Sequence, residues 1–184
     1  MPLPIETQRF FLSPFLISDI GEVYLSWLRD PEVVQWLNAQ FRHHDANSAR
    51  EWLAQHDNKD KFCLSVLVRD TKTHIGNISA NIDRRHGTAM IGVMIGDKRW
   101  WGSGVVLEIR EALLNWLFDE QNIHKVWSMP FVRNAPAIFN YRRQGFTCEG
   151  ILRAHRRRSN GEYLDVAIFS MLRDEWMLRR KGRK

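Results

Sequence analysis

The sequence predicts a mixed α+β fold, in which a mainly antiparallel twisted sheet is flanked by helices. Apolar residues recur at helical spacing near the N-terminus and at alternate positions in the middle of the chain. Three neighbouring strand patterns in the middle are joined by short turns, which favours antiparallel pairing. The order of elements is strand, helices, antiparallel strands, helix, strand, helix and hairpin, which is not a regular strand–helix alternation.

The N-terminal third is predicted to hold one strand and three helices. The strand covers Arg9 to Phe15 and closes at a proline. We expect Ser18 to cap the first helix, which Asp30-Pro31 ends while starting a second one that includes Trp36 and Leu37. A polar loop over residues 38 to 47 precedes a third helix, from Ser48 to His56; the loop includes Asn38, Arg42, His43, His44 and Asp45.

The middle of the chain changes to strand periodicity. Strands are expected over Phe62 to Arg69, around Ile75 to Ile82, and over Met90 to Ile95. Gly102-Ser103-Gly104 then opens the clearest helix of the chain. Its apolar face is predicted to carry Val106, Ile109, Leu113, Trp116 and Leu117, and its polar face Glu108, Arg110, Glu111 and Asn115.

The C-terminal third is predicted to hold a strand, a helix, a hairpin and a helical tail. The strand covers Val126 to Val132, and the helix runs from Asn134 to Gln144 and ends at Gly145. Two strands, Phe146 to His155 and Tyr163 to Leu172, meet at Asn160-Gly161, a strong hairpin signal. The tail is basic and ends in Arg179, Arg180, Lys181, Arg183 and Lys184.

Composition sets the class of protein. The 184 residues suit one domain, residues 1–184, and 44% of them are apolar and 26% charged, as in a folded chain. No apolar run is long enough to span a membrane, and no secretory signal opens the chain. Cys63 and Cys148 cannot supply a disulfide framework or a four-ligand zinc site, so we expect no metal and a reducing cytoplasmic setting.

The formal charge of +6 leaves the partner open among nucleic acid, an anionic membrane and a phosphorylated small molecule. The eight tryptophans favour core packing over a stacking platform for bases or sugars. The basic residues are scattered over several elements, so we expect no sequence-selective nucleic-acid binding and no membrane binding.

The glycine loop is the main chemical motif. Arg99-Trp100-Trp101-Gly102-Ser103-Gly104 lies between a predicted strand and a helix, where backbone N–H groups and the helix N-terminus favour a phosphate or pyrophosphate. A Walker loop is excluded because Val105 and Val106 follow the second glycine. A dinucleotide fingerprint is excluded because Leu107 stands where a third glycine or alanine is needed.

Two segments of the chain resemble the GNAT superfamily of acetyl-CoA-dependent N-acetyltransferases. Arg99-x-x-Gly102-x-Gly104 matches the family's Arg/Gln-x-x-Gly-x-Gly/Ala signature. About thirty residues later, the segment from Asn134 to Phe146 resembles the family's "Asn…Ala/Ser-Ile…Tyr-x-x-x-Gly-Phe" segment. The C-terminal region is similar to the branch with ribosomal-protein alanine, polyamine and amino-sugar N-acetyltransferases.

The resemblance implies a fold and a donor site. Two parallel strands, around Gly92 to Ile95 and Val126 to Met129, should splay apart, with Gly92 and Gly96 compatible with a bulge in the first. Acetyl-CoA should bind there, its pantetheine arm along the backbone of Val93, Met94 and Ile95. Its pyrophosphate should lie on the loop residues Arg99, Trp101, Gly102, Ser103, Gly104 and Val105. Asn134 and Ala137 match positions that contact the cofactor arm or an ordered water.

The resemblance also implies the chemistry, a direct attack of an amine on the thioester carbonyl. A backbone N–H of the splayed strand is the expected oxyanion donor, and Tyr141 matches the family's general acid for the departing thiolate. Many relatives carry a base, a glutamate, where Met90 stands here. Possible substitutes are water, Glu32, Asp83, His86 and the pair His43 and His44.

The acceptor amine is left open among a protein N-terminus, an amino sugar and another small amine, with a polyamine less favoured by the positive charge. Arg156-Arg157-Arg158 could flank the site of an acidic acceptor. The alternatives are a non-catalytic acyl-CoA sensor on the same fold, which Met90 mildly favours, and a nucleic-acid binder. The chain is expected to be a monomer or a homodimer.

Overall fold

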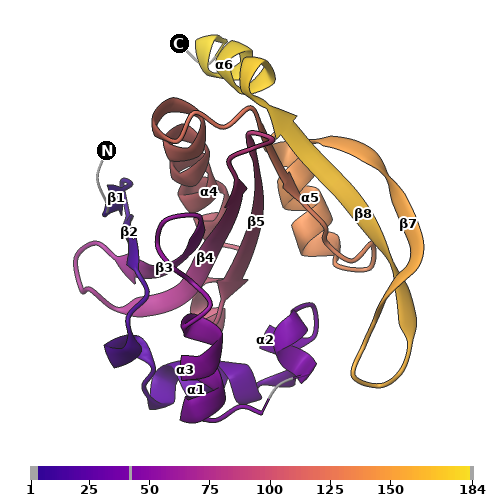
Figure 1. Cartoon of the computed structure of the whole chain (residues 1–184). Helices are drawn as coiled ribbons and strands as arrows, with labels where there is room; N and C mark the ends of the chain where they lie inside the picture. The colour runs from indigo at the N-terminus through magenta and orange to yellow at the C-terminus, as the bar shows by residue number, and fades with distance from the viewer. Residues whose placement is uncertain (1–3, 42, 183–184) are drawn as a thin grey trace.

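The computed structural model describes residues 4–41 and 43–182, which form one eight-stranded sheet with helices on both faces (Figure 1). The strand order is β1-β2-β3-β4-β5-β6-β8-β7. The strands are β1 (Ile5–Glu6), β2 (Phe10–Pro14), β3 (Lys61–Val68), β4 (His74–Asp83), β5 (Thr88–Ile95), β6 (Lys125–Ser128), β7 (Thr147–Arg157) and β8 (Tyr163–Leu172). Every neighbouring pair is antiparallel except β5 and β6. The predicted mixed, mainly antiparallel sheet is therefore confirmed.

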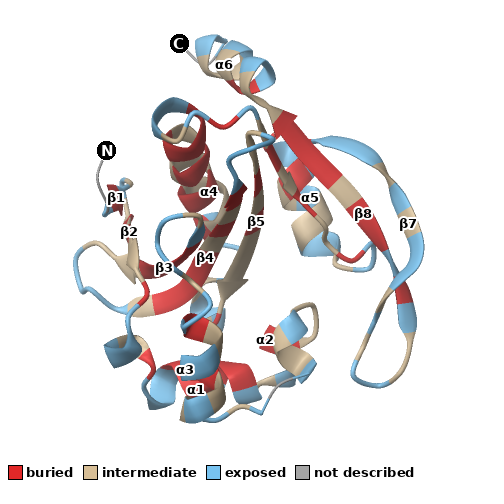
Figure 2. Ribbon diagram, viewed as in Figure 1, coloured by how far each residue is buried: buried red, intermediate tan, exposed pale blue. Residues whose placement is uncertain are grey.

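The helices divide between the two faces of the sheet. Beside α4 (Val105–Asn115), α5 (Ala135–Arg143) and α6 (Arg173–Lys181) lies the larger core, to which they contribute Ile109, Tyr141 and Trp176. Beside α1 (Glu22–Arg29), α2 (Pro31–Val34) and α3 (Ala46–Leu53) lies a second core, which includes Cys63. The larger core takes most of the buried surface, and the red bands of Figure 2 follow it along α4, β4 and β8.

The first helix starts later than the sequence predicts. Ser18 lies in a 3₁₀ turn, η1 (Ile17–Asp19), and α1 begins at Glu22 after Gly21. The Asp19 carboxylate accepts hydrogen bonds from the Leu16 N–H and the Ser65 hydroxyl, so the turn is held as a unit of its own. The Ser18 cap was therefore wrong.

Three further boundaries differ from the prediction. The second helix ends at Val34, so Trp36 and Leu37 lie beyond it, and a 3₁₀ turn, η2 (Asn38–Phe41), follows. The third begins earlier, at Ala46, because the Asp45 side chain accepts from the Ser48 N–H and caps it. Strand β6 ends at Ser128, and only Phe131 pairs again, with Val166.

The C-terminal hairpin agrees with its turn signal. Gly161 has φ +89°, and its N–H bonds to the Arg158 carbonyl. The hairpin extends from the rest of the sheet, and β7 is mostly exposed (Figures 1 and 2). Arg42, Arg183 and Lys184 lie outside the described residues. Among the residues that are described, no helix is long and apolar enough to cross a membrane.

Candidate active site

Strands β5 and β6 form a fork. They pair in parallel at Thr88↔Lys125, Ala89↔Val126 and Met90↔Trp127, and the pairing then stops. The last link is a hydrogen bond from the Ser128 hydroxyl to the Ile91 carbonyl, 2.9 Å long. The splayed strand pair is therefore present at the predicted place.

The fork is not made by a bulge at the glycines. The β4–β5 ladder runs from Asp83↔Thr88 to Gly76↔Ile95 without a register shift, which overturns that expectation. Instead, both glycines allow a neighbouring side chain to lie close to the backbone of β5 and the residue after it. A Cβ on Gly96 would lie 2.0 Å from the Trp27 ring, and one on Gly92 would lie 3.0 Å from the Ser79 hydroxyl.

The backbone of β5 presents Val93 to the open side of the fork. Backbone groups of alternate residues point to the same edge of a strand. The Ile91 carbonyl faces the β6 side, where Ser128 binds it, and the Ile95 carbonyl accepts a hydrogen bond from the Trp101 indole, 2.8 Å long. Val93 lies between these two occupied carbonyls, so its N–H and C=O face the gap. By the same alternation, the backbone of Met94 faces β4.

The glycine loop leads from η3 (Lys98–Trp100) to the start of α4. Gly102 and Gly104 have φ +75° and +80°, a conformation that L side chains rarely adopt. A Cβ on Gly102 would meet nothing within 4 Å, and Gly104 is the N-cap of α4. Exposed loop amides beside a helix N-terminus fit a pyrophosphate. The Arg99 guanidinium, 83% exposed, pairs with Asp97 at 2.7 Å.

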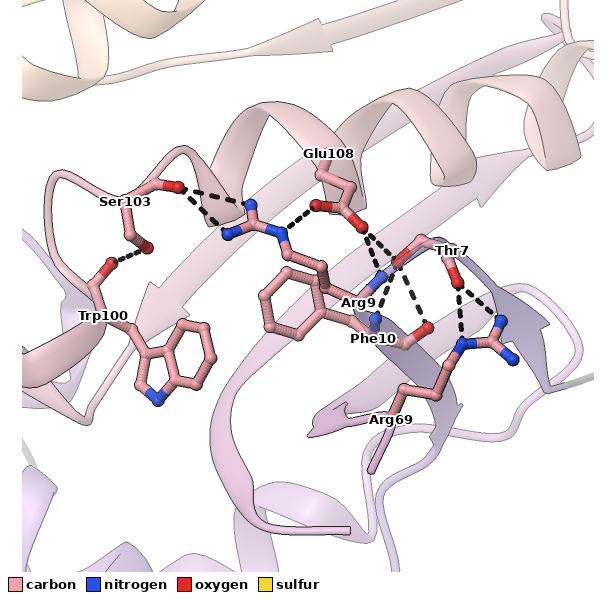
Figure 3. Close-up of polar contacts among 7 residues, drawn as sticks. All are labelled: Thr7, Arg9, Phe10, Arg69, Trp100, Ser103 and Glu108. Carbon is pink, nitrogen blue, oxygen red and sulfur yellow. Dashed lines mark hydrogen bonds and ion pairs between the residues drawn. The ribbon is translucent and has the colours of Figure 1, made fainter. Parts of the chain in front are cut away.

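A second arginine, which the sequence analysis missed, supports this loop from below (Figure 3). Arg9 Nη2 donates to the Ser103 carbonyl at 3.2 Å, and Arg9 Nε pairs with Glu108 at 2.7 Å. Glu108 also accepts from the Thr7 hydroxyl and the Arg9 N–H. The carboxylate thus ties the start of β2 to α4 and holds the loop in place.

Helix α5 lies along the other side of the fork. Asn134 caps it, because its side-chain oxygen accepts from the Ala137 N–H at 3.2 Å. Tyr141 is 4% exposed. Its ring packs against Phe146 at 5.1 Å and stacks on Phe169 at 5.4 Å, and Phe169 is the β8 partner of Ser128 at the fork.

A cavity of about 270 Å³ opens on the sheet face that α1 and α3 cover. It reaches Gly92, Val93 and Met94 of β5 and so borders the fork. Its other walls are formed by Tyr24, Leu28, Leu37, Asn38, Ala39, His43, His44, Ser48, Ala49, Trp52, His56, Cys63, Asn77, Ser79 and Asn81. None of the described residues that line it is an aspartate, glutamate, lysine or arginine.

The candidate bases lie in different parts of the molecule, and only some of them line the cavity. His43 and His44 line the cavity, and His56, which was given no role, joins them. Asp83 and His86 bond to each other in the β4–β5 turn, and Glu32 pairs with Lys98 on the surface. No group of three metal-ligating side chains lies close together among the described residues.

The polar stripe of the cavity was also missed. Asn77, Ser79 and Asn81 occupy alternate positions of β4, between the buried Ile78, Ala80 and Ile82. The signal was present, since a strand that alternates apolar and polar residues has two different faces. Because the polar face of a strand is usually solvated, the alternation alone does not indicate a site.

Comparison with known proteins identifies what this arrangement resembles. The profile of the acetyltransferase (GNAT) domain matches residues 9–147. An uncharacterised N-acetyltransferase, p20 of Bacillus licheniformis, is 29% identical over 92% of this chain and 96% of its own.

Two solved structures share the fold. The spermidine N-acetyltransferase of Vibrio cholerae, solved with CoA and spermine, has a TM-score of 0.80 at 20% identity and covers 92% of this chain and 98% of its own. A ribosomal L7/L12 α-N-protein acetyltransferase, solved with CoA, has a TM-score of 0.81 at 19% identity over 94% and 98%. These two structures share the fold of this chain, and the GNAT resemblance that the sequence motifs suggested is confirmed by the domain profile.

Proposed function

Because the chain belongs to the GNAT family of acetyl-CoA-dependent N-acetyltransferases, we propose that it acetylates a small primary amine. The amine would enter the cavity that borders the fork, which we call the acceptor cavity. The observation that carries this proposal is the contact between the cavity and Gly92–Met94 of β5. This segment borders the fork, where Val93 offers its backbone to the acetyl donor. An amine in the cavity would therefore meet the thioester carbonyl directly.

The donor is proposed to bind through backbone groups. The amides from Arg99 to Val105 would hold the pyrophosphate, the edge at Val93 the pantetheine arm, and α5 near Asn134 and Ala137 would flank the arm. The Ile95 carbonyl is already bound by Trp101, so Val93 carries most of the strand-edge pairing. The Val93 N–H, fixed in direction by the sheet, is the proposed donor to the oxyanion.

Two cavity histidines are proposed to take the proton of the amine. His44 Nε2 lies 2.9 Å from the Ala39 carbonyl, and His56 Nδ1 lies 3.1 Å from the Trp52 carbonyl. A carbonyl oxygen only accepts, so each of these ring nitrogens carries the hydrogen. In the neutral rings, His44 Nδ1 and His56 Nε2 are then left bare as proton acceptors. In this scheme a histidine accepts the proton, so the glutamate that many relatives carry in place of Met90 is not needed.

The amine nitrogen forms its bond to the acetyl carbon while the carbon–sulfur bond breaks. The proton of the amine passes to a histidine, directly or through water, and then to solvent. Tyr141 is proposed to donate its hydroxyl proton to the departing thiolate, as its position in the motif suggests. Its buried ring keeps the phenol in a fixed direction.

The walls of the cavity indicate which acceptors fit. A polyamine brings two or more positive charges, which need carboxylates when they leave water. The described residues that line the cavity include no carboxylate. They include amides, histidines and aromatic rings instead. The volume is below the roughly 300–1,000 Å³ of sites for drug-sized ligands. A single amine on a small neutral body, or the N-terminal residue of a peptide, fits best.

An acidic substituent on the acceptor is compatible with the hairpin tip. The Ser159 N–H bonds to Gln40 of η2, the turn that also lines the cavity through Asn38 and Ala39. Arg156 precedes Ser159 in the hairpin and is half-buried. It donates a hydrogen bond to the Met129 carbonyl and has no carboxylate partner among the described residues. The predicted flanking role of the Arg156–Arg158 cluster therefore stays open.

The test is a panel of amines in an assay that follows free thiol release from acetyl-CoA. The panel holds L-methionine, a peptide with N-terminal alanine, glucosamine, glucosamine 6-phosphate and spermidine. We expect turnover with at least one of the first four and none above the hydrolysis background with spermidine. Spermidine as the best substrate would contradict the acceptor class. Acetyl-CoA binding without turnover of any amine would favour the sensor.

A further inference from the structure

Helix α4 buries an arginine that its sequence pattern places on the polar face. Arg110 is 2% exposed, so the prediction for this residue was wrong. Burying a charge is costly unless a partner compensates it. Within residues 4–41 and 43–182, no carboxylate pairs with Arg110, and its Nε has no hydrogen-bond partner. Burial lowers the pKa of the guanidinium, yet arginine stays protonated in proteins.

The guanidinium of Arg110 lies over the ring of Tyr141. Its central carbon is 4.0 Å from the centre of that ring and 5.8 Å from the centre of the Phe146 ring. A cation over an aromatic face is attracted by the ring, most strongly where water is excluded. Together with Phe146 and Phe169, Arg110 therefore restricts the motion of Tyr141.

A buried glutamine keeps the arginine in this place. Gln144 is 2% exposed, and its Oε1 accepts from Arg110 Nη1 at 3.2 Å. The other end of the same amide, Nε2, donates to the Leu107 carbonyl of α4 at 2.9 Å. Gln144 follows Tyr141 by one helical turn, so it links α4 to the helix that carries the proposed acid.

We propose that Arg110 is a positioning residue for Tyr141, which fixes the phenol ring and stabilises the phenolate left after proton donation. The inference rests on the proposed acid role of Tyr141. As the carbon–sulfur bond breaks, the electron pair on sulfur takes the hydroxyl proton of Tyr141. A negative charge then appears beside a buried cation that pairs with no carboxylate of the described residues, and their attraction is strong in a water-poor interior. The phenolate regains its proton from solvent before the next turnover.

Packing alone does not account for an arginine at this position. An apolar side chain of similar length would fill the same space without the cost of removing a charge from water. Replacing buried charged groups by apolar ones is often neutral or stabilising. The charge is therefore best explained by the group that it contacts.

The test is a double-mutant cycle with Arg110→Met and Tyr141→Phe, using the best acceptor of the amine panel. We expect Arg110→Met to lower kcat by about tenfold or more while the Kd of acetyl-CoA and the KM of the acceptor change little. Its Tm should change little, because relief from burying a charge offsets the loss of the donor to Gln144 Oε1. In the Tyr141→Phe background, Arg110→Met should cause no further loss, because the residue through which it acts has lost its proton.

Two further variants complete the test. Arg110→Lys keeps the charge without the planar contact and should give an intermediate kcat; it also carries the test if Arg110→Met does not fold. Leu114→Met, at a buried apolar position of the same helix, controls for repacking. Unchanged kcat in Arg110→Met, or the same fractional loss in both backgrounds, would overturn the role of Arg110. Wild-type kcat in Tyr141→Phe would instead overturn the proposed acid, and the role of Arg110 with it.

Discussion

The two sides of β5 are built from different parts of the chain. The proposed donor side, formed by the loop 99–105, the Val93 edge and α5, presents backbone amides whose direction the sheet and the αL glycines set. The proposed acceptor side, which is the acceptor cavity, presents side chains from the N-terminal helices and from alternate positions of β4. In the proposed function, the first side recognises its substrate through the main chain and the second through the identity of its side chains.

This difference explains why one substrate is easier to infer than the other. A phosphate or an amide-rich arm binds to main-chain N–H and C=O groups. Such a site therefore needs a particular backbone conformation rather than particular side chains. Glycines at two positions before a helix start indicate such a conformation in the sequence, and the match to the two family motifs is what suggests its ligand. Recognition of an amine depends on which side chains face a cavity, and these come from distant segments.

The largest expected effect tests whether the donor side supplies the acid. Tyr141→Phe removes only the hydroxyl and keeps the ring that packs on Phe146 and Phe169. Loss of a positioned proton donor should lower kcat by roughly 10²- to 10⁴-fold. The Kd of acetyl-CoA, measured by calorimetry, should change much less, because the proton is needed only as the thiolate leaves. Near-wild-type kcat would make Tyr141 structural.

The second prediction tests whether the donor side works through its backbone. Gly104→Val places a branched side chain at φ +80°, which costs about 1–2 kcal/mol in an αL conformation and blocks close approach to the loop. We expect the Kd of acetyl-CoA to rise by about tenfold or more. Gly150→Ala, at a glycine with open space and no positive φ, is the control. Unchanged affinity in a folded Gly104→Val protein would exclude the loop as the pyrophosphate site.

The third prediction tests whether the acceptor side works through its side chains. Asn77 is 6% exposed and lines the cavity, and no described residue forms a hydrogen bond with its Oδ1. Asn77→Leu should raise the KM of the acceptor about fivefold, the value of one lost hydrogen bond, and leave the Kd of acetyl-CoA unchanged. Ser79→Ala on the same strand should have a smaller effect. An equal change in both constants would show that the two sides are not separable.

The smallest effect concerns the two thiols. Burial raises the pKa of Cys63 to about 12, whereas Cys148 is exposed on β7. Because the thiolate is the reactive form, a thiol reagent at neutral pH should label Cys148 alone and leave turnover intact. Mass spectrometry of the labelled protein checks this. If the thiol reagent inactivates the wild-type protein but not a Cys63→Ala variant, then the reagent reaches Cys63. The cavity wall would then open far more than its packing indicates.

Much of the fold could be predicted because the relevant signals are local. The alternation along β3 to β5, the glycine loop, the Asn134 cap and the Asn160-Gly161 turn all depend on residues within a few positions of one another. The helix starts that were misplaced also had local causes, since Asp45 rather than Ser48 carries the cap. The donor side was inferred for the same reason, because its motif is one continuous segment before a helix.

The sequence by itself therefore determined the class of fold and a glycine loop suited to a phosphate or pyrophosphate, and its resemblance to the GNAT superfamily implied the fork between two parallel strands. Only the tertiary structure decided that Arg9 and Glu108, 99 residues apart, hold that loop, and that His56 lines the same cavity as the polar residues of β4. It also decided that Arg110 is buried, because the rings of Tyr141 and Phe146 and the amide of Gln144 meet its guanidinium. Such contacts arise between segments distant along the chain, and no local spacing of residues encodes which side chains meet when a sheet and its helices close.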